Sequence, residues 1–196
     1  YRVEMMRTVT EHVSAPLLDV HALAESYASV QDRMLAATHR AGRTPDDITL
    51  VAISKALPLA SVKALYYLGH RHFGENRAAE GHDKMRAARE TFAPYEDPIV
   101  WHMIGHIQSR KARTSVSLFN LIHSVDTIKL AKRLSRFAAE SDTTASILLQ
   151  CNVSGEHTKS GFTASDIVHN TTQWSDLVNS ISQIAGLPNL KVVGLM

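Results

Sequence analysis

The chain has 196 residues, of which 44% are hydrophobic and 20% charged, and this balance suits one globular domain rather than a disordered chain or two enzyme domains. Its net charge is only +2, and its basic residues are spread along the sequence, which argues against a nucleic-acid-binding surface. One cysteine excludes an internal disulfide or a paired-cysteine site, and no apolar run reaches the ~18–20 residues of a membrane span, so we expect a soluble, cytoplasmic protein.

The first predicted element is a helix. Residues 1–15 come before it, and we expect them to be an N-terminal extension with a frayed end, followed by a single domain over 16–196. Gly42 stands where a glycine would end this helix. The apolar positions recur at steps of three and four residues, as on one face of a helix: Val20, Leu23, Tyr27, Val30 and Met34.

From residue 49 onwards, short apolar segments alternate with longer amphipathic ones, which is typical of βα repeats. The predicted strands are 49–54, 70–74, 99–104, 121–125, 146–153 and 190–195. A predicted helix follows every strand but the last, and crossovers of this length place neighbouring strands parallel. The pattern therefore predicts an α/β fold, either a (β/α)8 barrel of the TIM type or an open doubly wound sheet.

Glycine, proline and acidic residues mark the ends of the predicted helices. Pro58 begins and Gly69 ends the helix after the first strand. Asp126 is placed to cap the helix after the fourth strand, and Gly186 with Pro188 ends the last helix.

The count of strands is short of a closed barrel, which needs eight. The sequence ends at Met196, directly at the tip of an apolar strand, where the active-site loops of α/β proteins start. We therefore expect a barrel truncated after its sixth strand. In such a molecule the first and sixth strands would have unpaired edges, which favour association.

Lys55 is the most informative polar residue. Alternation along the first strand places it on the same side as Val51 and Ile53, at the carboxyl end of a parallel strand, where such folds bind ligands. Partial desolvation there would lower the pKa of the amine and favour a Schiff base with an aldehyde. The alternative, which the pattern alone favours, is that Lys55 extends from the strand into water.

Other strand ends carry polar side chains with two interpretations. Asn76 follows Gly74 and Glu75 after the second strand, where the asparagine could contact a polar ligand. Alternatively, Asn76 or Glu75 could cap the next helix. Ser124 and Asp126 are interpreted first as strand-end and capping residues.

The segment around the third strand contains two histidines four residues apart, His102 and His106. This spacing forms a metal pair on a helix but not on a strand, so we expect no metal site, and we interpret His102 as a hydrogen-bonded histidine near the end of the sheet. Residues 154–162 form a polar, glycine-punctuated loop of the kind that covers a site. Dinucleotide, P-loop and serine-hydrolase motifs are absent from the sequence.

Six blocks, in this order, resemble the pyridoxal phosphate homeostasis protein family. They are 51–55 (VAISK), 73–76 (FGEN), 101–111 (WHMIGHIQSRK), 123–126 (HSVD), 152–162 (NVSGEHTKSGF) and 194–196 (GLM). The resemblance spans residues 48–196 and implies the fold of the alanine racemase N-terminal domain, a (β/α)8 barrel that binds pyridoxal 5′-phosphate (PLP) through a lysine Schiff base. Lys55 matches that lysine.

The resemblance also implies further cofactor contacts. Asn76 would lie beside the cofactor, His102 and Ser124 would line the mouth of the barrel, and Met196 would reach its edge. Two family blocks, a Ser/Gly/Met/Ser-type loop and an Arg-Ile-Gly block that hold the phosphate and the ring nitrogen, are not matched. Because each lost charge-assisted hydrogen bond costs on the order of 1.5–3 kcal/mol, we expect weak or absent PLP binding by this polypeptide.

The function implied by the resemblance is that of a non-catalytic protein. It would bind PLP reversibly, help to balance PLP and amino-acid pools, and have amino acids and PLP-dependent enzymes as partners. One alternative is a PLP-dependent amino-acid racemase or lyase, although racemases use a tyrosine from a second domain that is not seen here. The other is a truncated barrel that acts as an interaction module.

Overall fold

The structure, a computed structural model, describes residues 18–95 and 97–196. The predicted N-terminal extension, 1–15, lies outside the described residues. The described residues separate into two compact units, the first ending at Ile48 and the second spanning Thr49–Met196, so a single domain over 16–196 stays a prediction.

The first unit contains the predicted N-terminal helix, which is confirmed as α1 (Val20–Arg40). Asp19 caps it, because the carboxylate accepts a hydrogen bond from the Ala22 amide at 3.0 Å. Gly42 follows the helix with a φ of 65°, a left-handed conformation that glycine adopts without steric cost. A short 3-10 helix, η1 (Pro45–Asp47), completes the unit.

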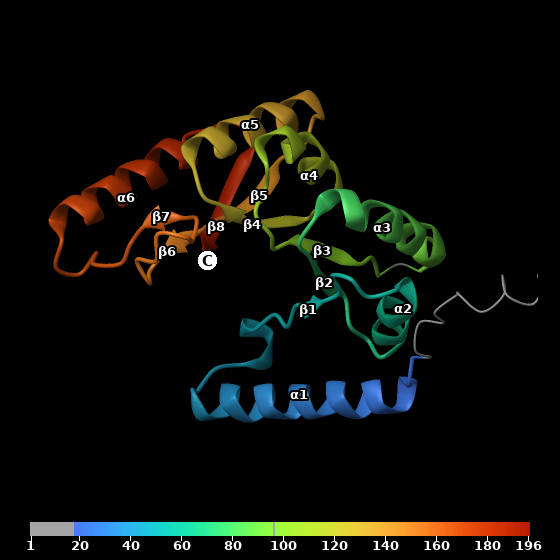
Figure 1. Ribbon diagram of the computed structural model, residues 1–196. Helices are drawn as coiled ribbons and strands as arrows, with labels where there is room; N and C mark the ends of the chain where they lie inside the picture. Colours follow the sequence, from blue (N-terminus) through green and yellow to red (C-terminus); the bar gives the residue numbers. More distant parts are fainter. Residues whose placement is uncertain (1–17, 96) are drawn as a thin grey trace, which may run out of the picture. The chain divides into compact units, whose positions relative to one another are not determined.

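The second unit is built on one parallel sheet, with the strand order β1-β2-β3-β4-β5-β8 (Figure 1). Its strands are β1 (Ala52–Ile53), β2 (His72–Glu75), β3 (Val100–Met103), β4 (Leu121–Val125), β5 (Ala145–Leu149) and β8 (Leu190–Leu195). Each of the six predicted strands overlaps a strand of this sheet, and two of them, 121–125 and 190–195, have the predicted bounds. The sheet is not closed, since β1 and β8 each have a single neighbouring strand within the described residues.

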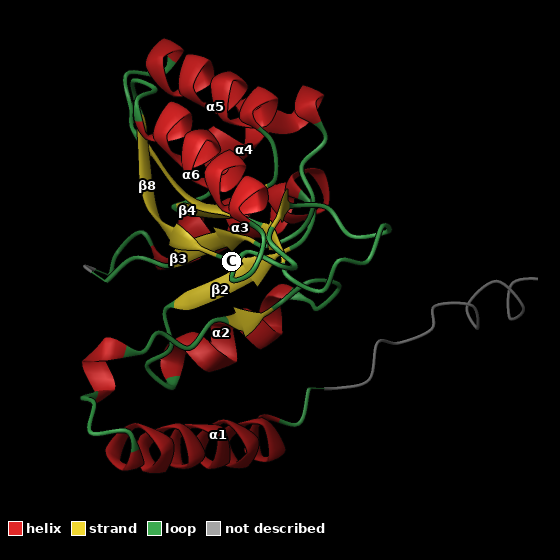
Figure 2. Ribbon diagram, turned by 90° about the vertical axis from the view of Figure 1, so that its left-hand side faces the viewer, coloured by secondary structure: helices red, strands yellow, loops and turns green. Residues whose placement is uncertain are grey.

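Helices connect successive strands, as the sequence predicts, and lie along one face of the curved sheet (Figure 2). They are α2 (Leu59–Tyr67), α3 (Ala78–Phe92), η2 (Ser109–Lys111), α4 (Ala112–Leu118), α5 (Ile128–Glu140) and α6 (Thr171–Ala185). Alternate strand residues on this face are at most 3% exposed and form the core with the helices: Phe73, Trp101, Met103, Ile122, Ile147 and Leu149.

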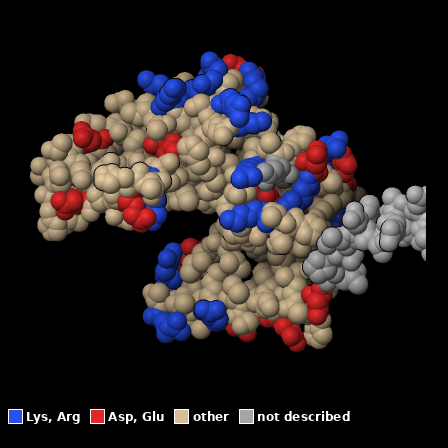
Figure 3. All heavy atoms as spheres, viewed as in Figure 1, with Lys and Arg blue, Asp and Glu red and all other residues tan. Residues whose placement is uncertain are grey.

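Helix α5 has a buried face and a basic face. Leu130 and Leu134 are at most 2% exposed and pack in the core. Figure 3 shows Lys and Arg side chains gathered over this helix. Four of them border one surface hollow: Lys129, Lys132, Arg133 and Arg136. The helix therefore joins the core on one side and presents cations on the other.

Several predicted helix ends are confirmed. Pro58 immediately precedes α2, Gly69 follows it with a φ of 92°, and Gly186 caps the end of α6. Within the described residues, no helix has both the length and the apolar character needed to cross a bilayer.

The prediction that Asp126 caps a helix is wrong. The cap of α5 is Thr127, whose hydroxyl oxygen accepts a hydrogen bond from the Leu130 amide at 3.2 Å. Asp126 instead contacts the His106 ring, with its Oδ2 3.1 Å from Nδ1. A threonine next in the chain can replace the aspartate as a cap, which leaves the carboxylate available for this partner.

The predicted strand 146–153 is divided in the structure. β5 ends at Leu149, and the following residues form β6 (Cys151–Asn152), which pairs in parallel with β7 (Phe162–Thr163) in a separate small sheet. The sequence does not predict β7, because two residues are too few to show the alternation of a strand.

Candidate functional site

The carboxyl ends of the six parallel strands lie along one edge of the sheet, where α/β proteins bind their ligands. Lys55 follows β1, Asn76 follows β2 and Met196 follows β8. His102 and Ser124 lie inside β3 and β4, each one residue before the end of its strand. The five predicted site residues therefore come from five strands of one sheet. Lys55, Asn76 and Met196 lie at the edge formed by the carboxyl ends of the strands, which we call the rim.

Lys55 occupies the second position of a turn in which the Leu57 amide donates to the Ser54 carbonyl at 3.0 Å. The third position, Ala56, has a φ of 59°, in the left-handed region. The Lys55 side chain is exposed, and it makes no hydrogen bond or ion pair with the described part of the chain. The expected desolvation is therefore wrong for this structure. Its cause is that β1 is an edge strand, on which even Ile53 is 45% exposed.

A buried polar network lies directly before Lys55. The Ser54 hydroxyl donates to Glu75 Oε1 at 2.7 Å, and Lys84 Nζ donates both to Glu75 Oε1 at 2.6 Å and to the Ser54 carbonyl at 2.7 Å. Ser54 and Glu75 are each 3% exposed, and the Lys84 side chain is 13% exposed. The network thus joins the end of β1 to β2 and α3.

Neither Glu75 nor Asn76 caps α3. The residue at the cap position is Arg77, without a side-chain capping bond. Glu75 points into the core toward Ser54 and Lys84, which removes it from the helix end.

The ends of β2, β3 and β4 are fastened together at Gly105. A Cβ atom there would lie 2.1 Å from the Asn76 carbonyl oxygen, so only glycine allows the two backbones to approach this closely. The Gly105 carbonyl accepts a hydrogen bond from the Ser124 hydroxyl at 2.5 Å, and the Ile104 amide donates to the Glu75 carbonyl at 2.9 Å. Ser124 is 1% exposed, so its hydroxyl is used inside the sheet.

Three histidines on adjacent strands are joined ring to ring. His102 Nε2 lies 3.0 Å from His72 Nδ1, and His102 Nδ1 lies 2.8 Å from His123 Nε2. Burial, followed by the neighbouring His123 and His72, lowers the pKa of His102 to about 4. Burial also lowers the pKa of His72 and of His123. The three rings are therefore neutral at neutral pH, and the interpretation of His102 as a hydrogen-bonded histidine is confirmed.

The described residues contain no cluster of three or more His, Cys, Asp or Glu side chains placed to hold a metal ion. His106 does not pair with His102, because it faces Asp126 instead. The Asp126 side chain is 6% exposed and that of His106 is 60% exposed, so a buried carboxylate orients an accessible imidazole.

His106 borders two pockets at the rim. The larger has a volume of about 430 Å³ and also includes Met196; the smaller, of about 200 Å³, includes Asn76. Lys55 lines neither of them. The rest of the larger pocket comes from the end of β3 and from the segment after β5: Ile104, Gln150, Cys151, Asn152, Val153, Ser154, Lys159 and Ser160.

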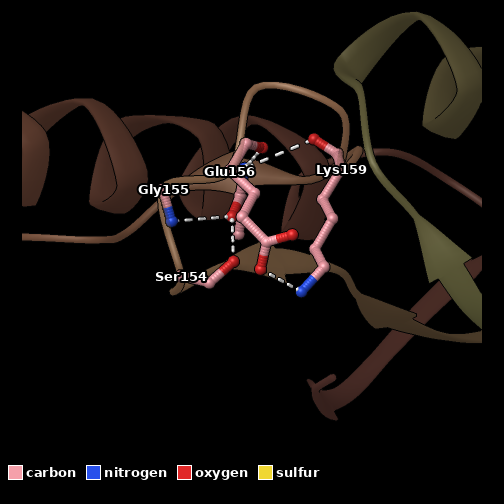
Figure 4. A network of polar contacts seen from close by, with 5 residues as sticks. Ser154, Gly155, Glu156 and Lys159 are labelled. Carbon is pink, nitrogen blue, oxygen red and sulfur yellow. Dashed lines mark hydrogen bonds and ion pairs between the residues drawn. The ribbon is translucent and has the colours of Figure 1, made fainter.

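The loop after β6 is organised by the Asn152 side chain, and Figure 4 shows its residues Ser154, Gly155, Glu156 and Lys159. Its Oδ1 accepts from the Gly155 amide at 3.0 Å and the Ser154 hydroxyl at 3.3 Å, while Nδ2 donates to the Glu156 carbonyl at 2.9 Å. Lys159 Nζ pairs with Glu156 Oε1 at 2.5 Å. These contacts fold the loop back on itself.

The same loop forms a wall of the larger pocket through Ser154, Lys159 and Ser160. It lies tightly against β6 because Gly161, with a φ of 132°, brings its backbone so close that a Cβ atom would be 2.8 Å from the Asn152 nitrogen. The predicted site-covering loop, 154–162, therefore does border a pocket.

Sequence reasoning missed His106 and Asn152. The asparagine has a signal, since Asn before a Ser-Gly pair favours a turn held by its side chain. For His106 there is no local signal, because its partner Asp126 is 20 positions away in the sequence.

The comparisons with known proteins agree with the resemblance. Residues 19–196 match the family model described as alanine racemase, N-terminal domain. The pyridoxal phosphate homeostasis protein of Escherichia coli is 34% identical over 174 residues, covering 89% of this chain and 69% of that protein. Its counterpart in Pseudomonas aeruginosa is 37% identical over 174 residues, with the same coverage of both chains.

Solved structures give the same result. PipY of Synechococcus elongatus without PLP superposes with a TM-score of 0.64 at 32% identity, covering 84% of this chain and 68% of PipY. PipY with PLP bound has a TM-score of 0.61 at 31% identity and covers 85% and 69%. Clostridium difficile alanine racemase shares the fold alone, with a TM-score of 0.57 at 13% identity over 85% of this chain and 38% of the racemase. The chain, an α/β protein of the TIM-barrel type whose sheet is open, therefore belongs to the pyridoxal phosphate homeostasis protein family.

Proposed function

We propose that this protein binds PLP for PLP and amino-acid homeostasis and holds the cofactor as a Schiff base on Lys55. The observation that carries the proposal is an accessible primary amine at the carboxyl end of β1 in a chain of this family. A relative of known structure, PipY, has been solved with PLP bound.

The residues at the rim fit such a group in two respects. An amine can condense with an aldehyde only if it is accessible and not tied up in an ion pair, and Lys55 satisfies this within the described residues. A pocket of about 430 Å³ lies at the same edge of the sheet, and its lining includes the Ser154 hydroxyl and the Lys159 amine, which can donate hydrogen bonds to a phosphate-bearing ligand. When bound, PLP supplies an electrophilic aldehyde.

The other predicted contacts divide into two groups. Asn76 and Met196 line the two rim pockets, so we propose that they contact the ligand. His102 and Ser124 are 4% and 1% exposed and already hydrogen-bonded, so their contribution is to hold β3 and β4 in place beneath it. Weak binding by this polypeptide, which the resemblance implies because two family blocks are not matched, stays a prediction.

Peptide mapping after reduction with borohydride tests the proposal. The chain is incubated with PLP, reduced and digested, and we expect the pyridoxyl label on Lys55. Lys55→Arg should lose this label, whereas Lys63→Arg, a lysine on the neighbouring helix α2, should keep it. A label confined to other lysines, or no label at any PLP concentration, contradicts the proposal.

We propose that the protein acts without turnover, with amino acids and PLP-dependent enzymes as partners. A reversible bond to one lysine needs no second acid or base, whereas a racemase needs such groups on both faces of the substrate carbon. Steady racemisation or elimination of any amino acid in a broad panel would instead support a racemase or lyase. A defined complex with another chain, without any label on Lys55, would support an interaction module.

A further inference from the structure

We propose that Glu75 and Lys84 are positioning residues for Lys55. They fix the backbone of Ser54, the residue before the lysine, and so determine where the amine is presented to an aldehyde. This inference rests on the proposed function of Lys55.

Every polar group of Ser54, in its backbone and in its side chain, forms a hydrogen bond. Its amide donates to the Gly74 carbonyl at 3.0 Å, and its hydroxyl donates to Glu75 at 2.7 Å. Its carbonyl accepts both from the Leu57 amide at 3.0 Å and from Lys84 Nζ at 2.7 Å. The peptide group that leads into Lys55 therefore cannot rotate without breaking the bonds of the Ser54 carbonyl to Leu57 and to Lys84 of α3.

The ion pair itself is costly to bury. Glu75 and Lys84 are 2.6 Å apart, with side chains only 4% and 13% exposed. A buried pair of this kind often stabilises a fold no more than an apolar pair of equal volume, so stability alone is a weak reason for it. Positioning of the backbone is a better reason for the ion pair. The directional hydrogen bond from the Lys84 ammonium group to the Ser54 carbonyl fixes the orientation of that carbonyl in a way that apolar side chains cannot.

The turn beyond the anchor is strained. Ala56 has a φ of 59°, a region that non-glycine residues avoid, and such a conformation persists only where the surroundings impose it. The hydrogen bond from Leu57 to Ser54 closes this turn around Lys55. If the anchor is weakened, the turn relaxes and the fraction of molecules that present the amine correctly falls. The apparent affinity falls by the same fraction.

Two variants and a matched control test the inference in the full chain. Ser54→Ala removes only the hydroxyl and leaves the ion pair intact, whereas Glu75→Gln removes the charge that holds Lys84. Asp83→Asn is the control, because this carboxylate lies on the same helix but is 85% exposed. Each variant is titrated with PLP well below its thermal midpoint, and the reduced label on Lys55 is quantified against the other lysines.

We expect both test variants to need about tenfold more PLP to label Lys55 to half, and the control to match the unmodified chain. Hydrogen exchange without PLP gives a second readout, because the Leu57 amide should exchange faster in both test variants and not in Asp83→Asn. Should Glu75→Gln fail to fold, Ser54→Ala decides.

The possible failures are distinguishable. If Lys55 is labelled equally in all four chains, and Leu57 exchanges equally, the positioning role is overturned while the proposed function stands. If the unmodified chain is not labelled at all, the proposed function fails, and the inference that depends on it fails too.

Discussion

Gly105→Ala is the substitution that should disturb the rim most directly. The new Cβ would lie 2.1 Å from the Asn76 oxygen and 2.8 Å from two further Asn76 backbone atoms. Since real Cβ atoms keep about 3 Å from such neighbours, the ends of β2 and β3 would have to separate by roughly 1 Å in a close-packed region.

The cost follows from the bonds that this separation breaks. The hydrogen bond from Ile104 to Glu75 contributes about 1 kcal/mol, and leaving the buried Ser124 hydroxyl without its Gly105 acceptor costs about 1–3 kcal/mol. We therefore expect Gly105→Ala to lower the free energy of unfolding by about 2–4 kcal/mol.

Urea denaturation followed by circular dichroism measures this value. Gly186→Ala is the control, because its Cβ would meet nothing closer than 3.5 Å and its φ of −79° suits alanine. That variant should be as stable as the unmodified chain, or more stable by about 0.4–1 kcal/mol. A loss below 1 kcal/mol for Gly105→Ala would refute the reasoning, because it would mean that the strand ends yield without breaking their hydrogen bonds.

Three further predictions concern the turn, the ion pair and the histidines. Ala56→Gly should raise the free energy of unfolding by up to about 1 kcal/mol in urea titrations, because glycine adopts a φ of 59° without strain; a decrease would contradict this. Lys84→Met should lower it by about 3–5 kcal/mol, since the Glu75 carboxylate is left buried without its partner, and a neutral result would show that water reaches the carboxylate. The unfolded chain binds a proton at His102 near pH 6.5 and the folded chain only near pH 4, so the stabilisation is complete above pH 6.5 and is lost as the pH falls toward 4. His102 should contribute at most about 1.4 kcal/mol per pH unit to the slope seen in denaturation curves, and His102→Gln should reduce the slope by that contribution.

The sheet and its helices could be predicted because the evidence for them is local. Alternation and length identify β4 and β8 to the residue, and Gly42 and Gly69 mark helix ends through their backbone freedom. These features depend on a few consecutive residues and not on the rest of the chain.

The site could be predicted only as a set of strand ends. Whether the Lys55 amine is desolvated depends on which strands flank β1. Its exposure follows from the edge position of β1, which no local sequence pattern reveals. Asp126 contacts His106, and Glu75 pairs with Lys84 and does not cap a helix. These contacts join segments that meet only after folding. Sequence pattern locates such groups but does not pair them.

The row of imidazoles across β2, β3 and β4 has a built-in direction. A neutral imidazole ring carries one N–H group. If His102 donates a hydrogen bond from Nε2 to His72, its Nδ1 must therefore accept one from His123. The reverse arrangement requires all three rings to change tautomer together. A charge or a donor that fixes the ring at one end thereby selects the state of the ring at the other. Three separate strands thus share one direction of hydrogen bonding, which has two alternative states.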